Sequence, residues 1–295
     1  MSPGRTSLFC DTGLAARIER AEAGLVAEAS AAAHRRGSAG FVTGLAGGVA
    51  SFAEAGSPFN KVAGLGFGGV PDANALAEVE RGFGAFGAPV TVELASLADP
   101  AIGAMLAGRG YLLAGFENVL GRALDGEPER VAPSGVEIRL IGADELGSWL
   151  DAVLAGFAEP DHQGGPGHEE FSREVVEWAE RDLAATSGVR LYLARLDGAI
   201  AGGAALRVTG RIAQFSGAAT VPAYRRRGVQ SALLATRLAD AAAAGCDIAV
   251  VTTAPGSKSQ QNAQRRGFDL LYTRVVLLRP PEPEPGHAPA SFGPH

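Results

Sequence analysis

Residues 215–234 read FSGAATVPAYRRRGVQSALL, and this stretch decides the fold class of the chain. Its small residues predict a strand that ends at Thr220, because Pro222 lacks the amide proton that a sheet ladder needs. Three arginines at 225–227 and Gly228 then precede a helix rich in Ala and Leu. The unpaired N–H groups and partial positive charge of a helix N-terminus suit a phosphate. The stretch therefore predicts an α/β protein with an anion site where a strand passes into a helix.

Strands and helices are expected to alternate on both sides of this stretch. In the second half, apolar periodicity predicts strands at 136–140, 189–195, 199–209, 211–219, 248–253 and 268–278 and helices at 143–156, 169–185, 228–244 and 257–266. In the first half it predicts helices at 12–36, 72–86 and 100–107 and strands at 40–52, 62–67, 90–94 and 111–120. A polar segment with two prolines separates the halves. We therefore expect a first domain at 1–124, a linker at 125–134, a second domain at 135–281 and a disordered tail, rich in Pro and Gly, at 282–295.

The two halves share short stretches in the same order. Residues 66–71, GFGGVP, align with residues 217–222, GAATVP, and residues 109–113, RGYLL, align with residues 266–270, RGFDL, at nearly equal offsets. Such matches can arise by chance in a chain rich in Gly and Pro. Their common order favours a tandem duplication, in which each half reads strand, Val-Pro, helix, strand, short helix, Gly-aromatic and strand.

The basic loop resembles the acyl-CoA-binding motif of the GNAT family of N-acetyltransferases, Arg/Gln-x-x-Gly-x-Gly/Ala. Here the motif reads Arg225-x-x-Gly228-x-Gln230, with a larger residue at its last position. Residues 255–268, PGSKSQQNAQRRGF, stand where the family has its Asn-x-x-Ala…Gly-Phe helix. The resemblance implies an α/β (α+β) fold of tandem GNAT-like domains, each a mixed central sheet flanked by helices. It also implies a site for CoA at Ala218, Ala219, Thr220, Arg225, Arg226, Arg227, Gly228, Val229, Gln230, Ser231 and Asn262.

The first half lacks this phosphate loop. After Val70-Pro71 the chain continues DANALAEVE, which is acidic where the second half is triply basic. An acidic helix start repels a pyrophosphate. We therefore expect a degenerate first copy that binds no CoA and either shapes the acceptor site or only supports the fold. Residues 57–61, SPFNK, either line a pocket or form a simple hairpin turn.

The activity implied by the resemblance is transfer of an acetyl group from acetyl-CoA, as co-substrate, to a primary amine of a small molecule. The amine must first lose a proton, so a carboxylate or a His is expected within reach. Candidates in the loop where the family often builds its acceptor site are Glu159, Asp161 and His162, with a solvated polar loop as the alternative.

A proton donor for the departing thiolate is not evident from the sequence. Many family members place a Tyr at the position that is Ala263 here. Water, Ser259 or Tyr272 could take that role.

The composition excludes several other classes of protein. The net charge of −6 argues against a protein that coats nucleic acid. Cys10 and Cys246 form no CxxC motif, so neither a metal site nor a disulfide framework is expected. No signal sequence and no long apolar span is evident, which predicts a cytoplasmic protein without a membrane partner. A homodimer is possible.

Two other functions remain open at this point. A non-catalytic acyl-CoA-binding sensor is consistent with the missing Tyr and with the lack of an evident base. A nucleotide-binding protein that uses the Arg loop is the second, but the loop lacks the Lys-Ser/Thr that a P-loop needs.

Overall fold

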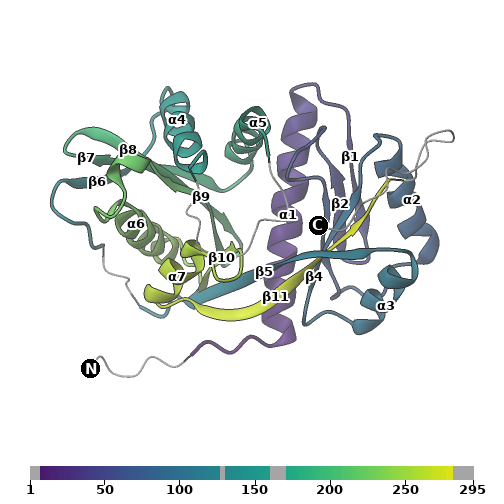
Figure 1. Cartoon of the computed structure of the whole chain (residues 1–295). Coiled ribbons are helices and arrows are strands. Elements are labelled where there is room, and N and C mark those ends of the chain that lie inside the picture. The colour runs from purple at the N-terminus through teal and green to yellow at the C-terminus, as the bar shows by residue number, and fades with distance from the viewer. Residues whose placement is uncertain (1–6, 127–129, 160–170, 282–295) are drawn as a thin grey trace, which may run out of the picture.

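The computed structural model describes residues 7–126, 130–159 and 171–281, and within these ranges it shows one sheet of eleven strands (Figure 1). In the first half the elements are α1 (Thr12–Arg35), β1 (Phe41–Leu45), β2 (Gly48–Phe52), β3 (Lys61–Leu65), α2 (Ala73–Gly84), β4 (Val90–Ala95), α3 (Pro100–Gly108) and β5 (Leu112–Ala123). In the second half they are β6 (Val136–Leu140), α4 (Leu146–Phe157), α5 (Arg173–Ala184), β7 (Val189–Leu196), β8 (Ala199–Thr209), β9 (Ile212–Thr220), a 3-10 turn (Pro222–Tyr224), α6 (Val229–Ala243), β10 (Ile248–Thr253), α7 (Lys258–Arg265) and β11 (Asp269–Arg279).

The prediction of a single strand at 40–52 is wrong. The structure has a hairpin here, and β1 pairs with β2 in antiparallel fashion. The chain reverses at Ala46 and Gly47, whose φ angles of 45° and 82° match the positive values of a tight hairpin turn. The Ala gave no turn signal in the sequence, because a non-Gly residue seldom adopts a positive φ.

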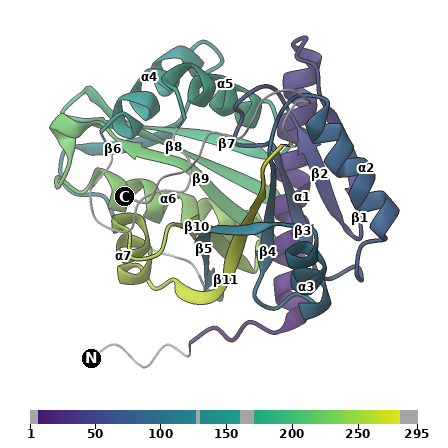
Figure 2. The same ribbon diagram turned by 45° about the vertical axis from the view of Figure 1, so that its right-hand side comes forward.

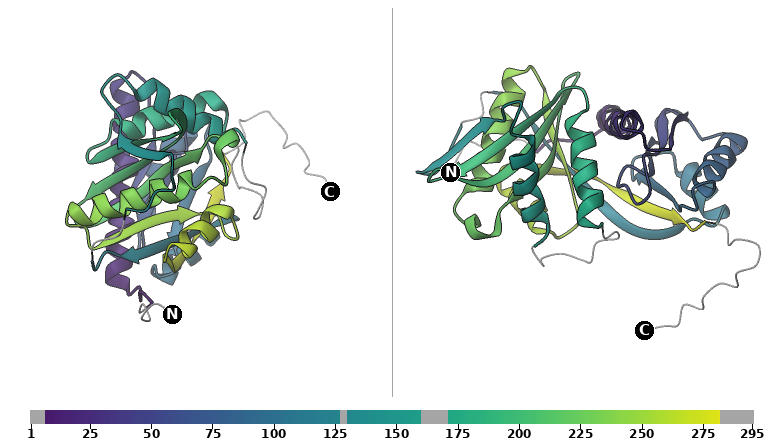
Figure 3. Two further views of the ribbon diagram at one scale, coloured as in Figure 1. Left: turned by 90° about the vertical axis from the view of Figure 1, so that its left-hand side faces the viewer. Right: turned by 90° about the horizontal axis from the view of Figure 1, so that it is seen from above.

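The two halves exchange their last strands. The sheet order is β1-β2-β3-β4-β11-β5-β10-β9-β8-β7-β6. Thus β11, from the second half, lies between β4 and β5, and β5, from the first half, lies between β11 and β10. Seen from above, these two strands bridge the halves (Figure 3). Each half therefore completes its sheet with a strand of the other.

The interior strand pairs repeat in the two halves. β3 pairs in parallel with β4, and β9 pairs in parallel with β10. Each pair is connected through Val-Pro and a helix, α2 or α6, and each is followed by a shorter helix and a long strand. This common order confirms the prediction of a tandem repeat.

Helices cover both faces of the second half. Successive side chains of a strand point to opposite faces. Leu191, Leu193 and Ala205 pack with α4 and α5, whereas their neighbours Tyr192 and Ala204 pack with α6. α4 and α5 therefore lie on one face of the sheet and α6 on the other.

Helix α1 stands between the two halves (Figures 1 and 2). Its Glu19 accepts hydrogen bonds from Arg274 Nε at 2.8 Å and from the Tyr272 hydroxyl at 2.6 Å, both on β11. Glu19 and Arg274 are each 1% exposed, so the pair is fully buried. The contact ties the first helix to the last strand. It also commits the Tyr272 hydroxyl to this interior network. No helix in the described part of the chain has the length and apolar character needed to cross a membrane.

Candidate active site

A groove opens where β9 and β10 separate. Their parallel pairing runs from Ile212–Ile248 to Phe215–Val251 and stops there, although β9 continues to Thr220. The groove has a volume of about 1040 Å³. Ten of the eleven residues assigned to CoA by resemblance line it, namely Ala218, Ala219, Thr220, Arg225, Arg226, Gly228, Val229, Gln230, Ser231 and Asn262.

The N-terminus of α6 at this groove is free of side-chain caps. Its cap residue is Gly228, with φ 84° and no side-chain hydrogen bond. A Cβ at this position would lie 2.4 Å from Pro133 Cγ, so both conformation and space require Gly. At the equivalent helix α2, the side chain of Asp72 accepts hydrogen bonds from the amides of Asn74 and Ala75. The amides of α6 are therefore available to an anion, whereas two of those of α2 are already occupied.

The three arginines of the loop have different surroundings. Arg225 donates to the Gly156 carbonyl at 3.0 Å and to the Glu159 carbonyl, so its guanidinium caps the C-terminus of α4. Arg226 adopts φ 61° and lines the groove. Arg227 pairs with Asp197 at 2.9 Å and does not line the groove. The assignment of Arg227 to the CoA site therefore stays a prediction.

Further polar groups lie along the groove. Asn262 on α7 donates a hydrogen bond from Nδ2 to Gln230 Oε1 on α6, and this bond links the two sides of the groove. The buried hydroxyl of Thr220 has no hydrogen-bond partner in the described protein. Lys258 and Arg265 of α7 add positive charge that sequence reasoning did not assign to the site. Cationic side chains, free amides and an unsatisfied hydroxyl together fit a phosphate-bearing ligand such as CoA.

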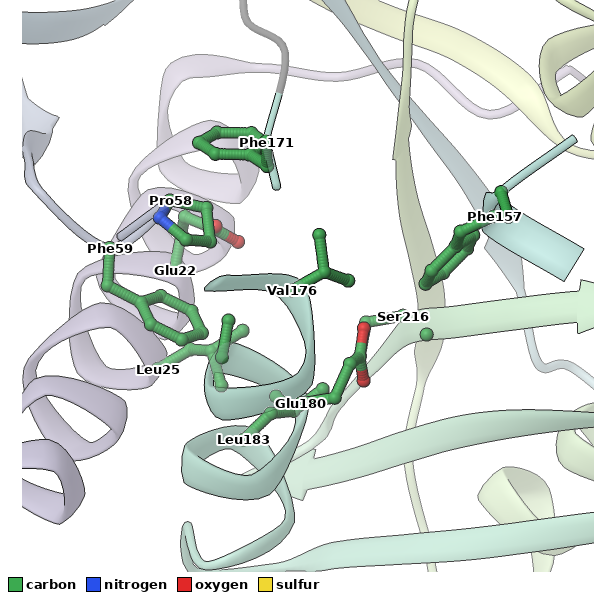
Figure 4. Close-up of a pocket in the computed structure, with 13 residues that line it drawn as sticks. Glu22, Leu25, Pro58, Phe59, Phe157, Phe171, Val176, Glu180, Leu183 and Ser216 are labelled. Atoms are coloured by element: carbon green, nitrogen blue, oxygen red, sulfur yellow. The ribbon is translucent and has the colours of Figure 1, made fainter. Parts of the chain in front are cut away.

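A second pocket, about 750 Å³ in volume, adjoins this groove along β9. Ser216 and Gly217 line the second pocket, the next residues Ala218 to Thr220 line the groove, and Phe157 lines both. We call this space the acceptor pocket. Its other walls come from α1, from the loop before β3 and from α5 (Figure 4).

Glu180 on α5 is the notable polar group of the acceptor pocket. Its carboxylate is directed toward Ser216 (Figure 4), and its buried Oε2 has no hydrogen-bond partner in the described structure. The buried hydroxyl of Ser216 also has none. Burial raises the pKa of Glu180 to about 7. A Cβ on Gly217 would lie 3.0 Å from Glu180 Oε2, so the Gly leaves room for this carboxylate.

The raised pKa predicts an effect on stability. The folded protein holds the proton of Glu180 more tightly than the unfolded chain, whose carboxyl ionises near 4.5. The free energy of unfolding of the wild type therefore falls as the pH rises from about 4.5 to about 7. Since Gln cannot ionise, we expect Glu180→Gln to gain stability relative to the wild type by about 3 kcal/mol between pH 4 and pH 8. Denaturant unfolding at the two pH values measures this difference, and an equal difference at both would contradict the burial of the charge.

The catalytic candidates named from the sequence are not gathered at this carboxylate. Glu159 is exposed and lies at the groove, where its carbonyl accepts from Arg225. Asp161 and His162 lie outside the described residues. Ser259, a possible proton donor, lines the groove, while Ala263 is buried in the core beneath it.

Glu180 was missed, although the sequence carried a signal for it. It lies on the same helical stripe as Val176, Ala179 and Leu183, and all four line the acceptor pocket. A carboxylate within the apolar stripe of a helix is costly to bury and so indicates a site.

Residues 154–268 match the model of the acetyltransferase (GNAT) family. The matched region contains β9, the basic loop, Glu180 and all of α7. This domain belongs to the GNAT family.

Two solved structures resemble nearly the whole chain. A GCN5-related N-acetyltransferase from Kribbella flavida has a TM-score of 0.65 and 21% identity, covering 92% of this chain and 97% of that one. A tandem GNAT protein from the clavulanic acid biosynthesis pathway has a TM-score of 0.58 and 16% identity, covering 94% and 98%. No curated protein matches the sequence. At these identities the likeness concerns the fold, and it confirms the predicted tandem of GNAT-like domains.

Proposed function

We propose that the protein is an N-acetyltransferase that transfers an acetyl group from acetyl-CoA to a primary amine of a small molecule. The match of residues 154–268 to the GNAT family model supports acyl transfer from acyl-CoA in general. The observation that carries the finer proposal is the unpartnered carboxylate of Glu180 at the junction of the acceptor pocket and the groove. An amine in that pocket would lie beside a base whose pKa is close to neutral.

The chain's own residues divide the work in this proposal. The amides at the start of α6 and the side chain of Arg226 hold the pyrophosphate. Glu180 accepts one proton from the ammonium, and the freed nitrogen pair forms the bond to the acetyl carbon as the bond from carbon to sulfur breaks. The second proton that the nitrogen loses ends on the sulfur of CoA. Ser259 at the groove is the donor candidate that lines the site.

We propose further that the first half binds no CoA. Gly68, which aligns with Ala219 of the groove, lies against the β1–β2 turn at Ala46, so a chain segment stands where a ligand would pass. Asp72 occupies amides at the start of α2. Both observations support one CoA site per chain. The domain bounds at 1–124 and 135–281 are retained as a proposal, with the exchanged strands β5 and β11 crossing between them.

The proposal is tested by thiol release from acetyl-CoA with a panel of primary amines and by calorimetric titration of CoA. We expect amine-dependent thiol release and about one CoA bound per chain. Tight CoA binding without turnover on any amine would instead favour the acyl-CoA sensor. Two CoA molecules per chain would contradict the degenerate first half.

We also propose a cytoplasmic protein whose partners are small molecules rather than nucleic acid or membrane. The two cysteines are unpaired, which supports a reducing compartment. A homodimer stays a prediction. Light scattering on the purified protein can test it by measuring the molar mass in solution.

A further inference from the structure

The acceptor pocket is lined mainly by apolar side chains from both halves of the chain. Phe59 and Pro58 come from the loop before β3, and Leu25 comes from α1. Phe157 and Phe171 complete the wall on the second half. In Figure 4 Phe59 and Phe157 lie on opposite sides of the space, with Val176 between them. A pocket of this size accommodates a small ligand, and each methylene it removes from water adds about fourfold in affinity.

The charges at the pocket have one sign. Its charged lining residues within the described structure are Glu180 and Glu22. Glu22 accepts from Gln214 Nε2 at 3.2 Å, and its Oε2 lies 3.9 Å from Arg274 Nη2. Arg274 is 1% exposed and donates to Glu19, so this cation does not reach the pocket. A ligand carboxylate would therefore meet like charge, with no compensating cation among the described lining residues.

The lining also disfavours acceptors with many polar groups. A polyamine or an aminoglycoside carries several charges or hydroxyls along its length. In a pocket walled by Phe, Leu and Val these groups lose water without gaining partners. Among the described lining residues the polar side chains are Glu22, Glu180 and Ser216. Glu22 already accepts from Gln214 Nε2 and lies near Arg274, whereas Glu180 and Ser216 have unsatisfied buried oxygens that face the reacting nitrogen.

Building on the proposed function, we infer that the acceptor is a primary amine with one aromatic, apolar body and no carboxylate, such as a phenylalkylamine. The amine faces Glu180 of α5, next to Ser216 of β9, and the apolar body extends between Phe157 and Phe59. The first half then acts in substrate selection, because Phe59, Pro58 and Leu25 form the far wall. Within residues 57–61, this assigns Pro58 and Phe59 to a pocket wall.

The test compares kcat/KM of the full-length protein, saturated with acetyl-CoA, for 2-phenylethylamine, ethylamine, phenylalanine, spermidine and kanamycin. We expect 2-phenylethylamine to exceed each of the others by at least about thirtyfold, a factor that the burial of one aromatic ring can supply. Equal or better use of phenylalanine, spermidine or kanamycin would overturn the inference.

A variant of the wall tests the same inference separately. Phe59→Ala is expected to raise KM for 2-phenylethylamine about tenfold and to narrow its advantage over ethylamine. Phe116→Ala is the matched control, because Phe116 is 47% exposed on β5 and lines neither space. An unchanged advantage in Phe59→Ala would contradict the role of the first half.

Failure of the proposed function gives a different result from failure of this inference. If no amine is acetylated, the proposed reaction is wrong, and calorimetric binding of the same compounds to the CoA-loaded protein still measures the pocket. Binding of 2-phenylethylamine at least about tenfold tighter than that of phenylalanine supports the inference. Equal affinities, or no binding of either compound, overturn it.

Discussion

Replacing Glu180 by Gln is expected to lower kcat for amine acetylation by about 100- to 10,000-fold, the range typical of losing a general base. The side chain keeps its size, so the packing of α5 against β9 is preserved. A Gln cannot accept the proton that an ammonium must lose before its nitrogen can form a bond. The CoA groove lies beyond Gly217 and does not include this side chain, so CoA affinity should change less than about twofold.

The matched control for this variant is Glu177→Gln on the same helix. Glu177 pairs with Arg181 at 2.9 Å, its side chain is 38% exposed, and it does not line the acceptor pocket. Its replacement should leave kcat within about twofold. Steady-state thiol release with 2-phenylethylamine or any other accepted amine measures both variants. Full activity in Glu180→Gln would remove this carboxylate from the mechanism and return attention to Asp161 and His162.

The parts of the fold that sequence reasoning predicted are those with local causes. Pro222 ends a strand and Gly228 opens a helix through their own backbone chemistry, so residues 215–234 could be interpreted without knowledge of the rest. The tandem repeat followed because the same local signals recur at Val70-Pro71. By contrast, the exchange of β5 and β11 leaves no trace in either strand. Their apolar patterns suit a buried central position in either half, and only long-range pairing decides between the two.

The same distinction applies to the site. The groove residues were found because the loop is continuous in sequence. The directions in which the side chains of Arg225 and Arg227 point could not be predicted. They depend on the Gly156 carbonyl and on Asp197, which come from distant segments. Glu180 was not predicted, because the polar loop after α4 carries several ionisable residues close together, whereas Glu180 is one of several charged residues within a helix. Its place in an apolar helical stripe, rather than its charge alone, identifies it.

The anion site itself is tested most directly by Ser231→Glu. Ser231 lies in the first turn of α6 and lines the groove, so the new carboxylate would face the pyrophosphate. We expect CoA affinity to fall at least about tenfold, equivalent to about 1.4 kcal/mol.

Ser231 is a better position than Gly228, where any side chain would also meet Pro133. An acid in the first turn suits the helix dipole, so α6 should stay folded in Ser231→Glu. The control is Asn74→Glu, which makes the same charge change at the exposed start of α2 and should leave CoA affinity unaltered. Calorimetry with CoA measures the loss, and S-acetylpantetheine, which lacks the pyrophosphate, should bind the wild type and Ser231→Glu alike. If CoA binds Ser231→Glu as tightly as the wild type, the pyrophosphate does not lie at the start of α6, because no carboxylate could stand in that first turn without repelling it.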